Sequence, residues 1–240
     1  ADSSLTALAE GLTEDVVTGL SRFSYLRVIA RGSTLRYTDQ ATDPRVVGKE
    51  LGAAYVMEGS LRQAGAKLRL AVQLVDAVSG AHLWAENYER SFNPEAVFEL
   101  QDELVPRIVS TVADMHGVLP RSMSEAVRGR APEELSPYEA VVRSFGYFDR
   151  VTAEELAAAR SGLELAVQQA PAHADAWAML ALLCVQEYAQ GFHLQADSLT
   201  SGETAARRAV EAAPSNHLAH FSLAQALFFQ KEFQSFRITA

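Results

Sequence analysis

The chain has 240 residues, of which 48% are hydrophobic and 21% charged, and its formal net charge is −9. This balance is typical of a folded globular protein and excludes general disorder. The acidic charge disfavours nucleic-acid binding by these residues, because phosphate groups would be repelled. The length suits one or two domains.

The single cysteine, Cys184, excludes an internal disulfide and a cysteine metal cluster. The longest apolar run, residues 177–185, is too short to cross a bilayer, and the N-terminus lacks the features of a signal peptide. We therefore expect no membrane insertion by these residues and a cytoplasmic location. A periplasmic location is the alternative, if a transmembrane helix precedes them in a parent protein.

The first ninety residues alternate helix and strand signals. Residues 4–23 have helical apolar spacing and predict two short helices or one helix kinked at Gly11, with Thr13 as a cap. Residues 25–30 form a short apolar run that predicts a buried strand. Asp43-Pro44 is a strong helix start, and that helix is expected to end at Gly52.

Three strands are expected next. Alternation over residues 55–61 and 68–74 predicts two antiparallel strands joined by a turn at Gly65, and residues 82–88 predict a third strand. One buried face implies that helices cover only one side of this meander. Glu58 is placed near Arg69 across the hairpin, which we interpret as a surface ion pair rather than a catalytic pair.

Asn93-Pro94 is expected to open a further helix, which Pro106 should kink or break. Residues 119–137 contain several prolines and glycines and predict a linker between a domain at residues 1–118 and one at residues 138–240. The expected fold class is therefore a small α/β domain of two or three layers with a mixed sheet, followed by an all-α domain.

The second half repeats itself. The Ala-Pro pairs at Pro171 and Pro214 each end a helical stretch, which indicates stacked helix pairs over residues 138–171, 172–214 and 215–240. These units resemble tetratricopeptide repeats. The residues that carry this resemblance lie in both helices of the second unit and at its end: Trp177, Leu180, Ala181, Cys184, Gly202, Ala206, Ala209 and Pro214. Relative to that family, extra residues fall in the loop 190–200.

The first half resembles the amino-terminal domain of the translocation protein TolB, and more closely the TolB-like segment that precedes tetratricopeptide repeats in some bacterial signalling proteins. Six segments carry this resemblance: residues 11–15, 28–31, 51–60, 73–76, 80–86 and 98–103. The family opens with an apolar strand ending in Leu-Pro-Phe, which does not occur here. The resemblance implies that such modules follow a class III adenylate cyclase domain or a winged-helix DNA-binding domain, and neither occurs in these residues.

Candidate catalytic or metal-binding residues have simpler interpretations. His217 and His220 share a helix face but have no further ligand at a suitable spacing, and Cys184 has no activating base beside it. Trp84 and Tyr88 share a strand face with His82 and are expected to be buried under the helix after Asn93. We expect no catalytic residue, no metal and no cofactor in this chain.

The first helix of each repeat should line a concave groove that binds an amphipathic helix or extended peptide of a protein partner. The repeat register places seven residues there: Ser144, Phe148, Ala178, Leu182, Phe221, Gln225 and Phe229. The alternative is that the N-terminal domain or another repeat covers this face. An open sheet edge also predicts a homodimer.

The sequence therefore predicts a non-catalytic regulatory module of a bacterial signalling protein. The alternative is the sensory half of a class III adenylate cyclase whose catalytic domain lies outside this chain.

Overall fold

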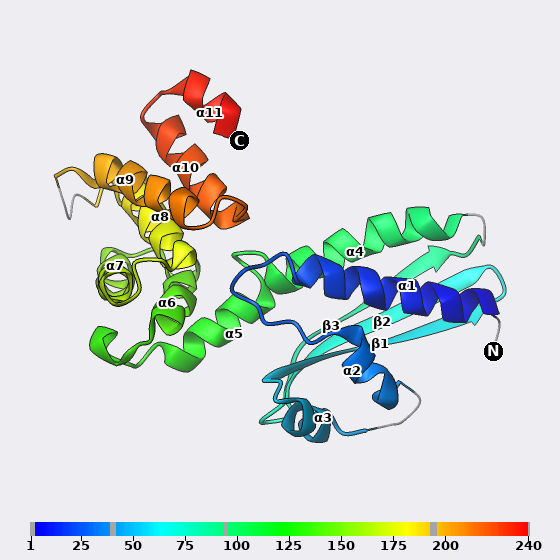
Figure 1. Ribbon diagram of the computed structural model, residues 1–240. Helices are drawn as coiled ribbons and strands as arrows, with labels where there is room; N and C mark the ends of the chain where they lie inside the picture. Colours follow the sequence, from blue (N-terminus) through cyan, green and yellow to red (C-terminus); the bar gives the residue numbers. More distant parts are fainter. Residues whose placement is uncertain (1–2, 39–41, 94–95, 193–195, 240) are drawn as a thin grey trace. The chain divides into compact units, whose positions relative to one another are not determined.

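The computed structural model describes residues 3–38, 42–93, 96–192 and 196–239 (Figure 1). The chain divides into two compact units, Ala1–Val118 and Leu119–Ala240. The first holds a three-stranded antiparallel sheet with helices, and the second is helical in the part of it that the structure describes. The expected fold class, a small α/β domain followed by a helical domain, is confirmed.

Helix α1 (Ser3–Leu20) is one continuous helix. Of the two predicted alternatives, two short helices is therefore wrong. The predicted cap at Thr13 is also wrong, because the Thr13 hydroxyl donates to the Ala9 carbonyl one turn earlier, at 2.8 Å. Gly11 instead permits a close approach: an added Cβ would lie 2.0 Å from the Gln101 amide nitrogen. The glycine therefore reflects packing between helices, which a local pattern does not reveal.

Residues 25–30 do not form the predicted strand. Residues 26–30 have no regular secondary structure, and no backbone ladder of the described residues includes them, so the sheet is wholly antiparallel rather than mixed. Tyr25 is buried, and its hydroxyl donates to the Ala113 carbonyl at 2.5 Å. The buried Tyr25 ring and this bond thus anchor the start of the apolar run. Helix α2 (Arg31–Thr34) and a 3-10 turn, η1 (Leu35–Tyr37), follow it.

Helix α3 (Pro44–Leu51) has the predicted boundaries. The Asp43 side chain accepts a hydrogen bond from the Arg45 backbone N–H, and Pro44 occupies the first helical position. At the other end Gly52 has φ 67°, a left-handed conformation that favours glycine.

The predicted meander is confirmed as β1 (Tyr55–Ala64), β2 (Lys67–Asp76) and β3 (His82–Ser91), in the order β1-β2-β3. Gly65 (φ 59°) and Gly80 (φ 75°) make the turns. Alternate residues of β2 are buried on one face, as their spacing predicted: Leu68, Leu70, Val72 and Leu74.

Helices α1 and α4 (Val97–Ala113) pack on this face of the sheet and complete the core of the first unit (Figure 1). Pro106 lies inside α4 without ending it. The break predicted there does not occur. Proline has no N–H, so the Asp102 carbonyl lacks its usual helical donor, but both residues are exposed and water can bond this carbonyl instead. Pro94, predicted to open this helix, lies outside the described residues.

Helix α5 (Val118–Val127) starts at the last residue of the first unit and continues into the second, where a 3-10 turn, η3 (Pro132–Glu134), follows it. These elements occupy most of the segment expected to be a linker. The buried Ser124 hydroxyl donates to the Arg143 carbonyl at 3.2 Å, so α5 packs on the following helix. Three helix pairs then follow: α6 (Pro137–Asp149) with α7 (Ala153–Gln169), α8 (Ala174–Gln190) with α9 (Ser198–Ala212), and α10 (His217–Phe229) with α11 (Phe233–Thr239).

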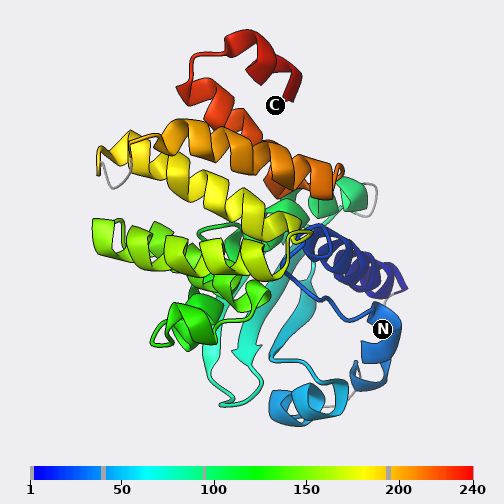
Figure 2. The ribbon, with the colours of Figure 1, turned by 60° about the vertical axis from the view of Figure 1, so that its left-hand side comes forward.

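Small side chains let these helices approach closely. Figure 2 shows α7, α8 and α9 lying side by side, and α10 contacts both α8 and α9. At Gly202 an added Cβ would lie 3.1 Å from the Cys184 Cβ and 3.2 Å from the Ala181 carbonyl oxygen. Ala178, Ala209 and Ala219 form a fully buried cluster. Within the described ranges, the helices are too short or too polar for any of them to span a membrane.

Candidate functional site

The groove predicted from the repeat register is only partly accessible. Ser144 on α6 and Ala178 on α8 are fully buried, and Leu182 on α8 is 3% exposed. Their predicted surface position is wrong, because α8 is surrounded by α6, α7, α9 and α10, and α6 in turn packs against α5, α7 and α8. The Ser144 hydroxyl is moreover bonded to the Val141 carbonyl at 2.6 Å. These three residues pack helices together and offer no surface to a partner.

The other predicted groove residues remain accessible. Phe221 is 47% exposed, and Gln225 and Phe229 are partly exposed, all on α10. Their spacing of four residues places them along one face of that helix. Phe148 on α6 is partly exposed and packs edge-on against Tyr147. The structure thus brings three of the seven residues together on a single accessible helix face.

A cluster of rings extends beyond this face. The Phe228 ring makes edge-to-face contacts with Phe229, Phe233 and Phe236, at centroid distances of 5.6, 6.1 and 5.7 Å. Phe229 also contacts Tyr188 of α8 at 6.2 Å. We call these five residues the aromatic cluster. Phe228, Phe233 and Tyr188 are each about half exposed.

The aromatic cluster as a whole was not predicted as a site, although the density of phenylalanine between residues 221 and 236 is a visible signal in the sequence. Edge-to-face ring pairs stabilise one another, and exposed apolar patches on a surface mark interaction sites. Helix α11 has no buried residue, so its rings contribute surface rather than core.

A hollow of about 350 Å³ lies between α7, α8 and α9, and its lining includes Arg160, Trp177 and Cys184. The Arg160 guanidinium donates to Glu164 at 2.8 Å and to the buried Glu187. Two carboxylates therefore already neutralise the cation in this hollow, so Arg160 offers no free charge to an anionic ligand.

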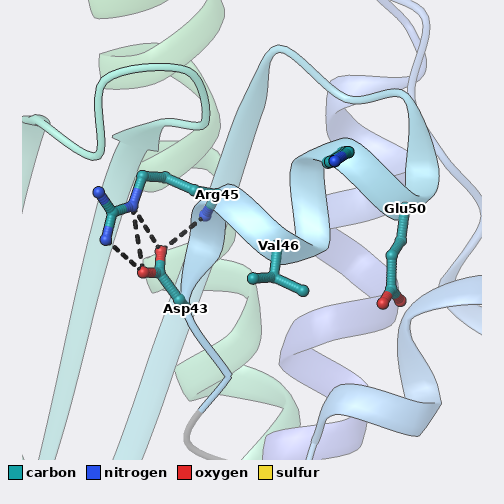
Figure 3. Close-up of a pocket in the computed structure, with 5 residues that line it drawn as sticks. Asp43, Arg45, Val46 and Glu50 are labelled. Atoms are coloured by element: carbon teal, nitrogen blue, oxygen red, sulfur yellow. Dashed lines mark hydrogen bonds and ion pairs between the residues drawn. The ribbon is translucent and has the colours of Figure 1, made fainter.

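A second hollow, of about 730 Å³, lies along one side of α3 (Figure 3). Asp43 and Arg45 form an ion pair there at 2.5 Å, while the Glu50 side chain points away from them. Hydrogen bonds from the Arg45 side chain and backbone lower the pKa of Asp43 to about 2. Asp43 caps the start of α3, and all the residues that line the hollow lie along the exposed side of this one helix. We therefore interpret the ion pair as a helix cap and not as part of a ligand site.

The catalytic and metal candidates remain without support in the described residues. No group of three or more potential metal ligands comes together among them. The His220 ring nitrogen Nε2 lies 2.7 Å from the Pro214 carbonyl oxygen, and His217 is exposed. Burial raises the pKa of the Cys184 thiol to about 11, so the thiolate needed for nucleophilic attack is scarce at neutral pH.

Of the two aromatic residues predicted to be buried in the sheet, Tyr88 is buried and Trp84 is partly buried. Tyr88 is 3% exposed and lies in the core cluster, and Trp84 packs against it. Burial and the hydrogen bond to Glu86 raise the pKa of Tyr88 to about 12. His82, on the same strand, is exposed and takes no part in this core.

The predicted pairing of Glu58 with Arg69 is wrong. In the register of the hairpin Glu58 lies opposite Gln73, whose amide donates to it at 2.7 Å. Arg69 donates to Glu89 on β3 at 2.9 Å. The register of the hairpin places Arg62, not Glu58, opposite Arg69, so each of these side chains has a different neighbour from the predicted one.

The comparisons with known proteins concern both units. Residues 2–107 match the family described as HilA/YgeH-like transcriptional regulator, second domain. The match runs from α1 into α4 and so covers the sheet and its helices. The resemblances to TolB and to tetratricopeptide repeats stay predictions.

A longer relative matches nearly the whole chain. It is called putative adenylate cyclase 3, from Rhizobium meliloti (strain 1021), and is 33% identical over 224 residues. The alignment covers 93% of this chain and 37% of the relative. The chain therefore spans a little over a third of that protein's length.

Proposed function

We propose that the chain is a non-catalytic regulatory module of a bacterial signalling protein, and that its helix pairs bind a protein partner. Two similarities support a regulatory or signalling role: the match of residues 2–107 to a domain of transcriptional regulators, and the relative named as a putative adenylate cyclase. Both units would act together in the parent protein, with the second providing the binding surface.

The observation that carries the binding proposal is the accessible face of α10. Phe221, Gln225 and Phe229 follow one another at helical spacing, and the aromatic cluster extends this apolar surface onto α11. Aromatic side chains are enriched at protein interfaces, where they bury large areas at low entropic cost. An amphipathic helix of the partner, with apolar residues at matching intervals, fits such a face.

Charge substitution tests this proposal in the parent protein. Phe221→Glu should abolish recovery of the partner after cross-linking in the cell, because a carboxylate would be desolvated at the centre of the contact. Phe98→Glu is the matched control, since Phe98 is 78% exposed and lies on α4 in the first unit. Equal recovery of the partner by wild type, Phe221→Glu and Phe148→Glu would contradict the proposal.

A second candidate function rests on the relative. In this alternative the chain is the sensory half of a class III adenylate cyclase, and partner binding would change the rate of cyclic AMP formation. The upstream reading frame of the gene distinguishes the two, since it would encode a cyclase domain with metal-binding aspartates. The full-length protein with Phe221→Glu should then form cyclic AMP at an altered rate. A full-length protein without cyclase activity excludes this alternative.

A further inference from the structure

Strand β1 forms one edge of the sheet, and its outer side is open. The sheet order is β1-β2-β3, so β1 has a strand neighbour on one side only among the described residues (Figure 1). The second half of the strand is also accessible, with Gly59, Ser60 and Arg62 exposed. An open edge presents unpaired N–H and C=O groups, which can accept another strand.

The turn determines which backbone groups point outward. Ala64 lies opposite Lys67 across the two-residue turn at Gly65, and in such a hairpin this closing pair exchanges both hydrogen bonds. The bond from the Phe92 N–H to the Ala66 carbonyl, at 2.7 Å, fits the same alternation on the β3 side. Even-numbered residues of β1 therefore bond to β2. Met57, Gly59, Leu61 and Gln63 direct their backbone groups away from it, and no other described backbone group bonds to them.

The outer face of the sheet carries an unbalanced cation at this edge. Arg62 lies directly opposite Arg69, an arrangement of like charges that destabilises a sheet. Arg69 has its own carboxylate, Glu89, whereas Arg62 forms no ion pair in the part of the chain that the structure describes. Glu58 lies four residues away on the same face and bonds only an amide, that of Gln73, among these residues.

We propose that β1 pairs with β1 of a second copy of this chain, antiparallel about a two-fold axis at Ser60. In this register Gly59 lies opposite Leu61 of the partner, and Met57 opposite Gln63, so the outward backbone groups meet as hydrogen-bonded pairs. Glu58 lies opposite the partner's Arg62 twice, in the pairs where side chains approach most closely.

Neighbouring registers lack this charge match. Moving the axis by one residue to Gly59 places Glu58 opposite Ser60, and moving it to Leu61 places Glu58 opposite Ala64. The register at Ser60 combines backbone and side-chain complementarity, and it joins two sheets into one of six strands. In a symmetric dimer the same surface contributes to both halves of the contact. Reversing one charge of the Glu58–Arg62 pair should therefore weaken the dimer, and reversing both charges should restore it.

Sedimentation velocity of the 240-residue chain at concentrations up to about 100 μM tests this pairing. Wild type should form a dimer. Gly59→Pro should be monomeric, because it removes an outward N–H that the second strand needs, while an edge strand tolerates proline. Gly59→Ala is the matched control and should dimerise, since the nearest atom to its new Cβ would be the Ala71 carbonyl oxygen at 3.6 Å.

The charge variants test the register independently of the proline. Arg62→Glu should weaken the dimer at least tenfold, and Glu58→Arg combined with Arg62→Glu should restore it. Arg22→Glu, an equal change of charge at an exposed site after α1, should have no effect. A wild-type monomer at all concentrations overturns the proposal. A Gly59→Pro variant that dimerises as wild type does, or a double reversal that stays monomeric, also overturns it.

Discussion

The carboxylate of Glu187 on α8 forms an ion pair with the guanidinium of Arg160 on α7 in the interior of the second unit, where the two side chains are 1% and 8% exposed. The Ser198 hydroxyl on α9 donates to the other Glu187 oxygen at 2.7 Å. One carboxylate thus joins three helices. Burying it is costly, and the cost is offset only while all its partners remain in place.

Truncation of this carboxylate should be strongly destabilising. Glu187→Ala is expected to lower the free energy of unfolding by about 3–5 kcal/mol, because the buried Arg160 then keeps its ion pair with the more exposed Glu164 but loses the buried carboxylate. Glu203→Ala, which breaks an exposed pair with Arg207, should cost less than about 1 kcal/mol beyond any change in helix propensity. Urea denaturation measures both. Similar values for the two variants would show that the buried pair has no special role.

Replacing both partners with apolar residues should be less harmful than removing one. Arg160→Met combined with Glu187→Leu removes both charges, so no uncompensated ion remains. The double variant should be more stable than Glu187→Ala in the same denaturation experiment. A double variant less stable than the single one contradicts this explanation.

A methyl group at Gly48 has no room. Its Cβ would lie 2.3 Å from the Ala77 Cβ and 2.7 Å from the Ala53 carbonyl oxygen, so α3 would have to move from the end of the sheet. We expect Gly48→Ala to destabilise the first unit by roughly 1–3 kcal/mol despite the better helix propensity of alanine. Gly32→Ala in α2 is the control, since no atom lies within 4 Å of its new Cβ. Thermal unfolding followed by circular dichroism should show a lower midpoint for Gly48→Ala only.

The start of α6 should depend on pH. Ser136 and Glu139 form a capping box, with the Ser136 N–H donating to the Glu139 carboxylate at 2.9 Å. Hydrogen bonds from the Ser136 backbone and hydroxyl, together with Arg130, lower the pKa of Glu139 below its ordinary value. The charged form therefore stabilises the fold above the unfolded pKa of about 4.3, and this contribution is lost as the pH falls through the lower folded pKa.

Two variants separate the cap from its charge. Ser136→Ala should cost about 1 kcal/mol at neutral pH, because an N-terminal backbone group loses its acceptor. Glu139→Gln keeps a hydrogen-bonding side chain without the charge, so its deficit relative to wild type should be present at pH 7 and shrink below about pH 4. A deficit that stays constant over this range would exclude the charge as its source.

Cys184 should be unreactive in the folded protein. The thiol is 1% exposed, and burial raises its pKa to about 11. An aromatic disulfide reagent at pH 8 should therefore modify it slowly in buffer and rapidly in denaturant, where access is restored and the pKa returns toward about 8.5. Rapid modification without denaturant would show that the interface between α8 and α9 opens readily.

Short sequence patterns correctly predicted the elements that depend only on neighbouring residues, such as helix ends and the alternation of a strand. Asp43-Pro44 and Gly52 define both ends of α3, and alternation in β2 gives its buried face. Residues 25–30 were predicted wrongly because a strand also needs a hydrogen-bonding neighbour, which composition cannot supply. Gly11 was likewise misread, since the close approach of Gln101 comes from a helix about ninety residues later.

In the candidate site, too, features set by nearby residues were predicted and features set by the packing of distant helices were not. The periodicity of α10 indicated a face containing Phe221 and Phe229, and that face is accessible. The equivalent positions Ala178 and Leu182 of α8 are buried, because α8 has helices packed against it from several directions. How many neighbours a helix has depends on the stacking of whole units, and the sequence of that helix alone does not determine it.

The hydrogen bond from Tyr25 to Ala113 affects the order in which the chain can fold during synthesis. It joins the segment that follows α1 to the last residue of α4, so the first unit remains incomplete until α4 has left the ribosome. The helix pairs of the second unit contact their neighbours along the chain and can form one after another as they emerge. The nascent first unit should therefore be the more exposed to chaperones and proteases.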